Sequence, residues 1–343
     1  MLEQILQQEI KQKGPLSQSR FMELALQHPI YGYYKSNEAI GQDFTTSPEI
    51  SQVFGELIGA WAIDCYEKLG YPTTLSLVEL GPGKGTLMAD FLRMSKISPA
   101  FSQALNIHLV EINPLLKPIQ ERTIAYPLHT VESFYQIPES SDPLIIIANE
   151  FFDVLPTNYF VRKDNILYER CIDYHNETFN FTLLKRMDNP GPDQAWEESP
   201  ASIALIKEIF TKLLKQKGIF LCIDYGYEQG HGESLQALFE KKFSDPLCHI
   251  GKSDLTCHVN FGRLKEIARL NGLGVCGPLP QGQFLNNIGF ELRIEMLKHK
   301  NPLEIKNLDR SATRLTHPQE MGELFKVMAV FSPPTFTPLG FEE

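Results

Sequence analysis

The chain has 343 residues, of which 43% are hydrophobic and 22% charged, and these ordinary globular values exclude a disordered or low-complexity protein. With 32 Lys and Arg against 42 Asp and Glu, the net charge is −10, which gives no support to binding of a nucleic-acid backbone. No apolar run approaches the roughly 18 residues that span a bilayer. The six cysteines form no CxxC pair, so neither a disulfide framework nor a metal site is predicted.

Residues 1–74 are predicted to be a helical region. Apolar residues recur at helical spacing from Leu2 to Ile10, and a second short helix is expected before His28. A longer helix is predicted to begin with Ser47 as its N-cap and to end near Gly70, because Ser caps helices well and Gly ends them.

The loop at residues 29–48 is dense in Gly, Pro and aromatic residues. Such a loop can act as a lid that closes over a ligand and excludes water, which benefits a transfer reaction that competes with hydrolysis. It can equally be a packing loop, and the sequence favours neither interpretation. Its aromatic residues are Tyr31, Tyr33, Tyr34 and Phe44.

From residue 75 onward, apolar segments of strand length alternate with amphipathic helical segments. This alternation predicts an α/β domain with a parallel sheet and crossover helices. The predicted strands are residues 75–80, 106–112, 127–131, 143–150, 219–226, 272–279 and 324–331. A helix at 202–218 is expected to end with Gly218 as its C-cap.

Two segments interrupt this alternation. Residues 157–190 contain short alternating runs broken by clusters of polar residues, which predicts an inserted antiparallel β meander. Residues 227–271 are expected to be loop and short helix near the strand ends. We therefore expect a helical region at 1–74 with the lid loop, followed by a domain at 75–343 that carries both insertions.

The strongest local motif is a glycine turn between a buried strand and a helix, VELGPGKGT at residues 78–86. Gly81, Gly83 and Gly85 permit positive φ and a close approach of backbone to a ligand. Ligands of parallel sheets bind at the carboxyl ends of strands, where this turn lies. The spacing matches neither a Walker A loop nor a GxGxxG fingerprint, and a tight turn without a ligand is the alternative interpretation.

Two carboxylates narrow the choice of ligand. Glu79, two residues before Gly81, sits poorly with a pyrophosphate and suits an ammonium group. Glu111 ends the next strand, where an acidic side chain can accept both hydroxyls of a ribose. A nucleoside with an ammonium group and no phosphate describes S-adenosylmethionine, which is therefore the predicted cofactor.

A second group of polar residues follows the apolar strand at 143–150. Asn149, Glu150 and Asp153 leave this strand at the sheet edge where the cofactor is expected. We interpret them as residues of an acceptor site, although a capped strand end would give the same pattern. Asp224, at the end of the neighbouring strand, is a further candidate that could instead cap a turn.

Several segments, in this order, resemble one family of methyltransferases. They are HPIYGYY, DFTTSPEISQVFGELIGAW, VELGPGKGTLMADFLR, IIIANEFFDVLP, IDYG, SDLTCHVNF and LFKVMAV. Over nearly its whole length the chain resembles the MidA-like family, which contains the mitochondrial complex I assembly-factor arginine methyltransferase. Lys84 stands where the family often has Arg, and Asn260 where it often has Asp; neither residue is expected to decide the chemistry.

The resemblance implies a class I methyltransferase fold of Rossmann-like type, a seven-stranded and mostly parallel sheet whose last strand is antiparallel. It also implies binding of S-adenosylmethionine. The glycines of the turn would hold the methionine moiety, and Glu79 would accept from its ammonium group. Glu111 would bind the ribose, with Val131 or Glu132 beside the adenine.

For the mitochondrial relative, the resemblance implies dimethylation of an arginine in a complex I subunit. The pKa of arginine exceeds about 12, so carboxylates must clamp its guanidinium and orient one nitrogen toward the methyl group. The candidates for this acceptor site are Glu150, Asp153, Asp224 and Asn149. We therefore expect a protein arginine N-methyltransferase whose partner is a complex I subunit or its counterpart.

Two alternatives remain open: a cofactor-binding assembly factor with little catalysis, and a methyltransferase for a small molecule. The N-terminal residues show neither a signal h-region nor an Arg-rich transit segment. We therefore expect the cytoplasm of a bacterium-like cell, or the mitochondrial matrix if the source is a eukaryote. No nucleic-acid partner and no membrane span are expected, and the sequence does not indicate an oligomeric state.

Overall fold

The computed structural model describes residues 1–36, 45–230 and 232–342. Their contacts group the chain into two compact units. Unit 1 comprises residues 1–44, 152–206 and 227–260, and unit 2 comprises residues 45–151, 207–226 and 261–343. The region expected at residues 1–74 therefore contributes to both units.

Seven strands of unit 2 form a mostly parallel sheet in the order β4-β3-β2-β5-β10-β16-β15. They are β2 (Leu75–Leu80), β3 (Leu105–Val110), β4 (Leu128–Val131), β5 (Leu144–Asn149), β10 (Gly218–Tyr227), β15 (Gly274–Pro280) and β16 (Phe325–Ser332). The last strand, β16, runs antiparallel to both of its neighbours, and the pairs from β10 to β4 are parallel. The class I methyltransferase fold predicted from the sequence is confirmed.

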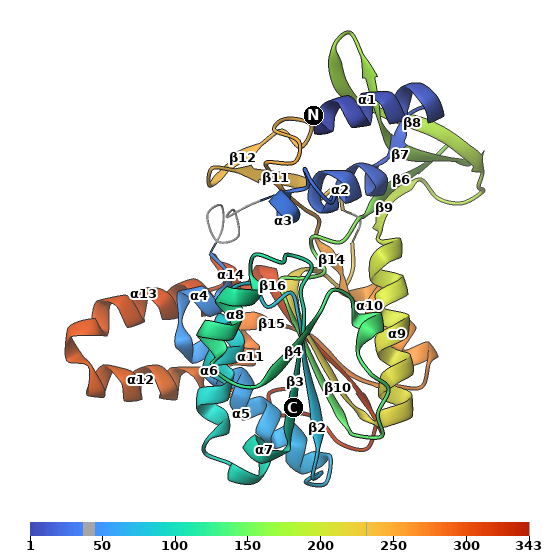
Figure 1. Cartoon of the computed structure of the whole chain (residues 1–343). Helices are drawn as coiled ribbons and strands as arrows, with labels where there is room; N and C mark the ends of the chain where they lie inside the picture. The colour runs from blue at the N-terminus through green and yellow to red at the C-terminus, as the bar shows by residue number, and fades with distance from the viewer. Residues whose placement is uncertain (37–44, 231, 343) are drawn as a thin grey trace. The chain divides into compact units, whose positions relative to one another are not determined.

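Helices cover both faces of this sheet, with α5 and α6 on one face and α9 and α10 on the other (Figure 1). The helices of this part are α4 (Ser47–Ile50), α5 (Gln52–Lys68), α6 (Thr86–Ser95), α7 (Pro99–Ala104), α8 (Lys117–Ile124), α9 (Pro200–Gln216), which begins in unit 1, and α10 (Phe261–Leu270). Between β15 and β16 the chain forms four helices that the sequence analysis did not assign. They are α11 (Gln281–Asn287), α12 (Phe290–Lys300), α13 (Ile305–Thr316) and α14 (Met321–Leu324).

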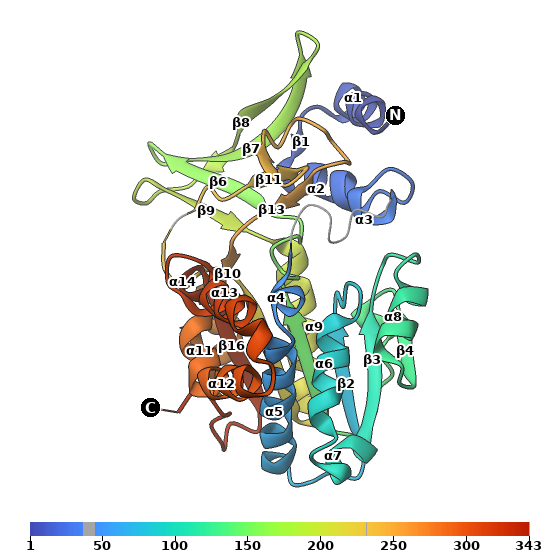
Figure 2. The same cartoon turned by 90° about the vertical axis from the view of Figure 1, so that its left-hand side faces the viewer.

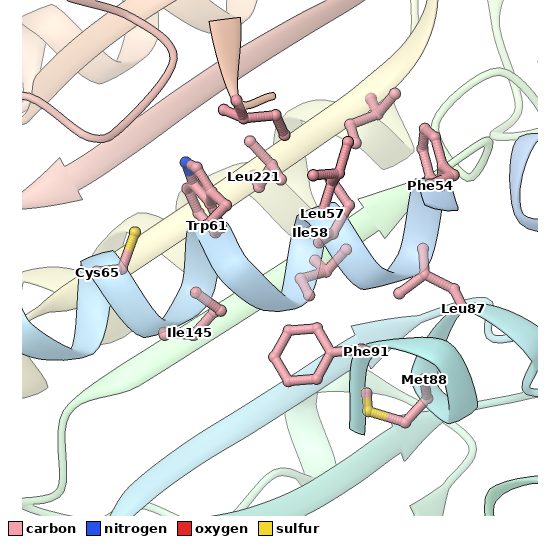
Figure 3. Packing of buried hydrophobic residues seen from close by; sticks show 14 of the residues in the cluster. Phe54, Leu57, Ile58, Trp61, Cys65, Leu87, Met88, Phe91, Ile145 and Leu221 are labelled. Atoms are coloured by element: carbon pink, nitrogen blue, oxygen red, sulfur yellow. The ribbon is translucent and has the colours of Figure 1, made fainter. Parts of the chain in front are cut away.

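The core of unit 2 lies between α5, α6 and the sheet. Figure 3 shows Trp61 and Ile58 of α5 and Phe91 of α6 with Ile145 of β5 and Leu221 of β10. All five of these side chains are fully buried. Since each buried large apolar side chain contributes roughly 1.5–3 kcal/mol, this layer fixes α6 and the turn that precedes it against the sheet.

Two glycines allow α5 and α6 to approach closely. A Cβ atom on Gly55 would lie 2.6 Å from Cβ of Asp90, and one on Gly59 would lie 2.8 Å from the carbonyl oxygen of Phe91. Glycine inside a helix costs about 0.5–1 kcal/mol relative to alanine. The close packing of the two helices offsets this cost.

The long helix does not begin where the sequence analysis placed its cap. Thr46 is the N-cap of the single turn α4, and Ser47 is already helical. The chain then becomes extended at Ser51, whose side chain accepts a hydrogen bond from the amide of Val53 and so caps α5. The prediction of Ser47 as the N-cap was wrong because Thr46, in an extended conformation, caps the first turn, and a break at Ser51 starts the long helix anew.

The predicted C-cap of α9 was also wrong by one residue. Lys217, with a φ of 62°, makes the left-handed turn after α9, and Gly218 is the first residue of β10. A Cβ atom on Gly218 would lie 2.0 Å from the carbonyl oxygen of Leu144. Gly218 is therefore required by the close approach of β10 to β5 and not by the helix end.

Unit 1 contains an antiparallel sheet in which the predicted meander forms the centre (Figure 2). Its strands are β1 (Leu16–Ser17), β6 (Asn158–Lys163), β7 (Ile166–His175), β8 (Thr178–Asp188) and β9 (Gln194–Glu198). Asp164 with Asn165, and Asn176 with Glu177, have positive φ and form the two tight turns, as two-residue hairpins require. The helices α1 (Leu2–Lys13) and α2 (Gln18–Gln27) both contact β7, and α3 (Tyr33–Ser36) follows.

The segment expected as loop and short helix at 227–271 is more regular than predicted. It forms the three-stranded antiparallel sheet β12-β11-β13, then β14 (Val259–Asn260) and α10. The strands are β11 (Gln236–Phe239), β12 (Lys242–Ser244) and β13 (Asp254–Thr256). Strands of three or four residues are too short to show a period in the sequence. None of the helices in the described residues is long and apolar enough to cross a membrane.

Candidate functional site

The glycine turn of unit 2 joins β2 to α6. Gly81, Gly83 and Gly85 all have positive φ, at 64°, 53° and 83°. A Cβ atom on Gly81 would lie 2.8 Å from the ring of Phe151, and one on Gly85 would lie 3.0 Å from Ile124. On Gly83 it would meet no atom of the described residues within 4 Å, so these residues leave open space at Gly83, where a ligand can approach the backbone.

Glu79 lies at the end of β2 and is almost fully buried. Its Oε2 accepts no hydrogen bond within the part of the chain that the structure describes. Burial, and secondly the charge of Glu111, raise the pKa of Glu79 to about 8. A buried carboxylate of this kind is stabilised by a cationic ligand, because a nearby positive charge favours its ionised form.

Glu111 follows β3 directly and is held by two donors. The backbone amide of Asn113 donates to its Oε1 over 2.7 Å, and Nε2 of Gln120 donates to its Oε2 over 3.2 Å. A carboxylate has about four lone-pair positions, so two donors of this kind fix the orientation of the Glu111 side chain at the end of the strand. Gln120 was missed in the sequence analysis, and nothing in the local pattern of α8 marks it.

Of the two residues expected beside an adenine, Val131 is the last residue of β4 and Glu132 follows it. The carbonyl oxygen of Val131 accepts a hydrogen bond from the amide of Glu111 over 2.9 Å, which brings these two residues together. The side chain of Glu132 is exposed, and its amide donates to Gln136. Glu79, Glu111 and the glycine turn therefore lie with Val131 at the carboxyl ends of three adjacent strands, β2, β3 and β4.

Asn149 and Glu150 lie at the carboxyl end of β5, next to β2. Oε1 of Glu150 accepts from the amide of Ser47 over 2.8 Å and from Nδ2 of Asn149 over 3.1 Å. Glu150 has a φ of 50°, which is uncommon for a residue with a side chain and is seen mainly at functional or strained positions. Oδ1 of Asn149 is buried without a partner in the described residues.

Asp224 is fully buried on β10, the other neighbour of β5. Its Oδ2 accepts from the amide of Phe151 over 3.1 Å, and its Oδ1 accepts from the amide of Tyr225 over 3.0 Å. These bonds fix the backbone immediately after Glu150. Asn149, Glu150 and Asp224 are thus brought together at the ends of adjacent strands.

Asp153 belongs to unit 1, whereas the other three acceptor candidates belong to unit 2. It is buried, and its carbonyl oxygen accepts from the amide of Cys257 over 2.8 Å. In the same unit, the hydroxyl of Tyr34 donates to Asp254 over 2.8 Å. The pKa of the Tyr34 hydroxyl is raised, first by burial and then by the charges of Asp254 and Asp153.

The aromatic residues expected in a lid are placed only in part. Tyr33 is buried and packs edge-on against Tyr34, with 5.1 Å between ring centroids. Tyr31 stacks on His28. Phe44 lies outside the described residues, so the lid stays a prediction. Among the described residues, no three His, Cys, Asp or Glu side chains are grouped in a way that could hold a metal ion.

The residues of the turn fit the cofactor that the sequence predicted. Glu79 offers a buried anionic group to an ammonium, Glu111 offers acceptors to a diol, and Gly83 leaves space for the ligand between them. The arrangement lacks a phosphate-binding feature of the kind a Walker A lysine or a GxGxxG turn provides.

Comparison with known proteins identifies the family. Residues 57–279 match the model of the family described as "Putative S-adenosyl-L-methionine-dependent methyltransferase". Protein arginine methyltransferase NDUFAF7 homolog, mitochondrial, of Drosophila melanogaster is 31% identical over 95% of this chain and 84% of its own. The mitochondrial protein arginine methyltransferase NDUFAF7 of Homo sapiens is 29% identical over 95% of this chain and 82% of its own.

A solved structure shares the whole fold. This protein from Burkholderia thailandensis, crystallised with S-adenosyl-homocysteine, has a TM-score of 0.83 and is 23% identical, covering 99% of this chain and 93% of that one. The resemblance drawn from the sequence motifs is confirmed. The chain belongs to the family of S-adenosyl-L-methionine-dependent methyltransferases, and S-adenosylmethionine is its cofactor.

Proposed function

We propose that the protein is a protein arginine N-methyltransferase and that its acceptor is a respiratory complex I subunit or a counterpart of one. The names of the relatives support arginine as the acceptor, and the family resemblance supports the complex I subunit. The observation that carries the proposal is the placement of Glu150 and Asn149 on the strand next to the glycine turn.

The proposed cofactor site consists of the residues at the ends of β2, β3 and β4. The backbone of Gly81, Gly83 and Gly85 binds the methionine moiety, while Glu79 accepts from its ammonium group. Glu111 binds the ribose hydroxyls, and Val131 with Glu132 lies by the adenine. When bound, S-adenosylmethionine supplies an electrophilic methyl group on a sulfonium.

The proposed acceptor residues of unit 2 are Glu150, Asn149 and Asp224, and Asp153 of unit 1 stays a further candidate. A guanidinium is cationic and delocalised at neutral pH. The carboxylate of Glu150 binds it through charge-assisted hydrogen bonds and orients one nitrogen for attack. The same carboxylate can then accept the proton that this nitrogen loses. Asp224, whose oxygens both accept backbone amides, holds the strand end in place.

The test uses the purified full chain with radiolabelled S-adenosylmethionine and a cell lysate, followed by mass spectrometry of proteins from cells with and without the gene. Methylarginine that is lost without the gene, on a protein that the purified chain also labels, supports the proposal. Binding of the cofactor without transfer to any protein supports an assembly factor with little catalysis. Label in the small-molecule fraction alone supports a small-molecule methyltransferase. A bacterial cytoplasmic location stays a prediction.

A further inference from the structure

We propose that Gln120 is a positioning residue that fixes the cofactor turn and the ribose-binding carboxylate with one amide group. Its Nε2 donates to the carbonyl oxygen of Gly83 over 2.8 Å and to Oε2 of Glu111 over 3.2 Å. An amide nitrogen carries two hydrogens, so one group can serve both acceptors. This inference rests on the proposed roles of the glycine turn and Glu111.

The position of Gln120 is set by packing and not by the ligand. The residue is fully buried on α8, and α8 contacts α6. A Cβ atom on Gly85 would lie 3.0 Å from the side chain of Ile124 and 3.5 Å from Cα of Gln120. The helix therefore lies against the turn, and the Gln120 amide reaches its two acceptors from a fixed backbone.

The two acceptors belong to the parts of the site that bind different ends of the cofactor. Gly83 is in the turn proposed to bind the methionine moiety, and Glu111 is proposed to bind the ribose. The backbone amide of Asn113 holds the other oxygen of Glu111 over 2.7 Å. With Gln120 donating to Oε2, both oxygens of the carboxylate are held and its orientation is fixed.

A role in packing alone does not explain a glutamine at this position. Its Oε1 is buried and accepts no hydrogen bond from the described residues, and leaving such a polar atom unpaired destabilises the folded chain. A leucine or methionine would fill similar volume without this cost. The donor group of Gln120 is therefore the feature that the site uses.

The test measures binding of two probes to the full chain by calorimetry. S-adenosyl-homocysteine carries an amino-acid moiety, homocysteine, and the adenosine; 5′-methylthioadenosine carries the adenosine and a methylthio group but no amino-acid moiety. Gln120→Met keeps the volume and removes both donated bonds, so its Kd is expected to rise at least about tenfold for each probe, since charge-assisted bonds are the strong ones. The matched control is Gln216→Met, because Gln216 is also buried but lies in the last turn of α9, away from the glycine turn; its Kd values are expected to stay unchanged.

A double-mutant cycle separates positioning from a structural effect. In a Glu111→Gln background, the effect of Gln120→Met on 5′-methylthioadenosine is expected to shrink, because the amide acts through Glu111. If Gln120→Met does not fold, Gln120→Asn, which keeps the amide and withdraws it by one methylene, is expected to show the same loss for both probes.

Three other binding results would each contradict a different part of the proposal. Wild-type affinity of the folded Gln120→Met or Gln120→Asn variant for both probes overturns the inference and leaves the proposed cofactor site standing. A loss for S-adenosyl-homocysteine alone overturns the claim that one amide fixes both parts. Failure of the wild-type chain to bind either probe contradicts the proposed cofactor site itself.

Discussion

The backbone amide of Ser47 donates a hydrogen bond of 2.8 Å to Oε1 of Glu150, so the first residue of α4 holds the carboxylate at the end of β5. In the same short helix, Glu49 forms an ion pair of 3.0 Å with Lys84 of the glycine turn. One helical turn therefore contacts both the proposed acceptor carboxylate and the cofactor turn. The ion pair is partly exposed and contributes little to stability by itself. The hydrogen bond to Glu150 is therefore the stronger of the two contacts of α4.

Glu150→Gln should leave cofactor binding near normal and lower methyl transfer at least about a hundredfold, because the variant loses the charge that binds a guanidinium and accepts its proton. The amide oxygen of Gln can still accept from Ser47, so the strand end should keep its structure. Calorimetry with S-adenosyl-homocysteine and a transfer assay with radiolabelled cofactor measure the two effects. Transfer at the wild-type rate would show that Glu150 does not act on the acceptor.

Gly83→Val should abolish binding of the cofactor, because the branched side chain enters the open space of the turn at a φ of 53°. Gly272→Val is the matched control, since Gly272 also has positive φ and open space around its Cβ position but lies outside the turn. The control should lose stability, by about 1–3 kcal/mol, and keep its affinity for S-adenosyl-homocysteine. Equal affinities of the two variants would contradict the role of the turn.

Binding of the cofactor should release a proton near pH 7. Burial and the charge of Glu111 raise the pKa of Glu79 to about 8, so the empty protein holds this proton, and an ammonium group favours its loss. Affinity for S-adenosyl-homocysteine should therefore increase as the pH rises from about 7 toward 8. Calorimetry in two buffers with different ionisation enthalpies detects the proton, and Glu79→Gln should remove the difference. Identical enthalpies for the wild type would refute this coupling.

The same group should make the folded chain less stable as the pH rises. The pKa of Glu79 in the folded state exceeds its ordinary value of 4.5. Its contribution is therefore fully present below that value and is lost as the pH rises through about 8. Urea unfolding across this range should show a decline in the free energy of unfolding that is smaller in Glu79→Gln. A steeper decline in the variant would mean that the sign is wrong.

Gly59→Ala should destabilise unit 2 by about 1–3 kcal/mol, although alanine is the better helix former. The reason is that its Cβ atom would lie 2.8 Å from the carbonyl oxygen of Phe91 and 3.0 Å from Cβ of Met94. Glu67→Ala, at an exposed position of the same helix, is the control and should change stability by less than about 0.5 kcal/mol. Urea unfolding compares them, and a stabilised Gly59→Ala would show that the two helices can separate without cost.

The sequence predicted those elements whose burial or backbone conformation follows from their own residue types. The strand predicted at 143–150 contains the unbroken apolar run 144–148, and its burial on both faces follows from that composition. Gly81 to Gly85 predicted a turn because glycine alone adopts such φ values readily. The position of Glu111 followed from its place at the end of the next strand.

The parts that were missed depend on distant residues. Gln120 acquires its importance only when α8 packs against the turn, and no neighbour in the sequence reveals this. Asp153 stands three residues from Glu150, but the chain passes from unit 2 to unit 1 at residue 152, so its place among the acceptor residues stays a prediction. Gly218 was interpreted as a helix cap because its contact with Leu144, 74 positions away, is invisible in the local pattern.

The close packing of α5 on α6 has a consequence for ligand binding. Because Gly85, the last glycine of the turn, is the N-cap of α6, a sideways displacement of the helix is transmitted to the backbone that we propose binds the cofactor. Gly55 and Gly59 thus support the proposed cofactor turn from the protein interior. Substitutions at these two glycines should therefore lower cofactor affinity although neither residue lies in the turn.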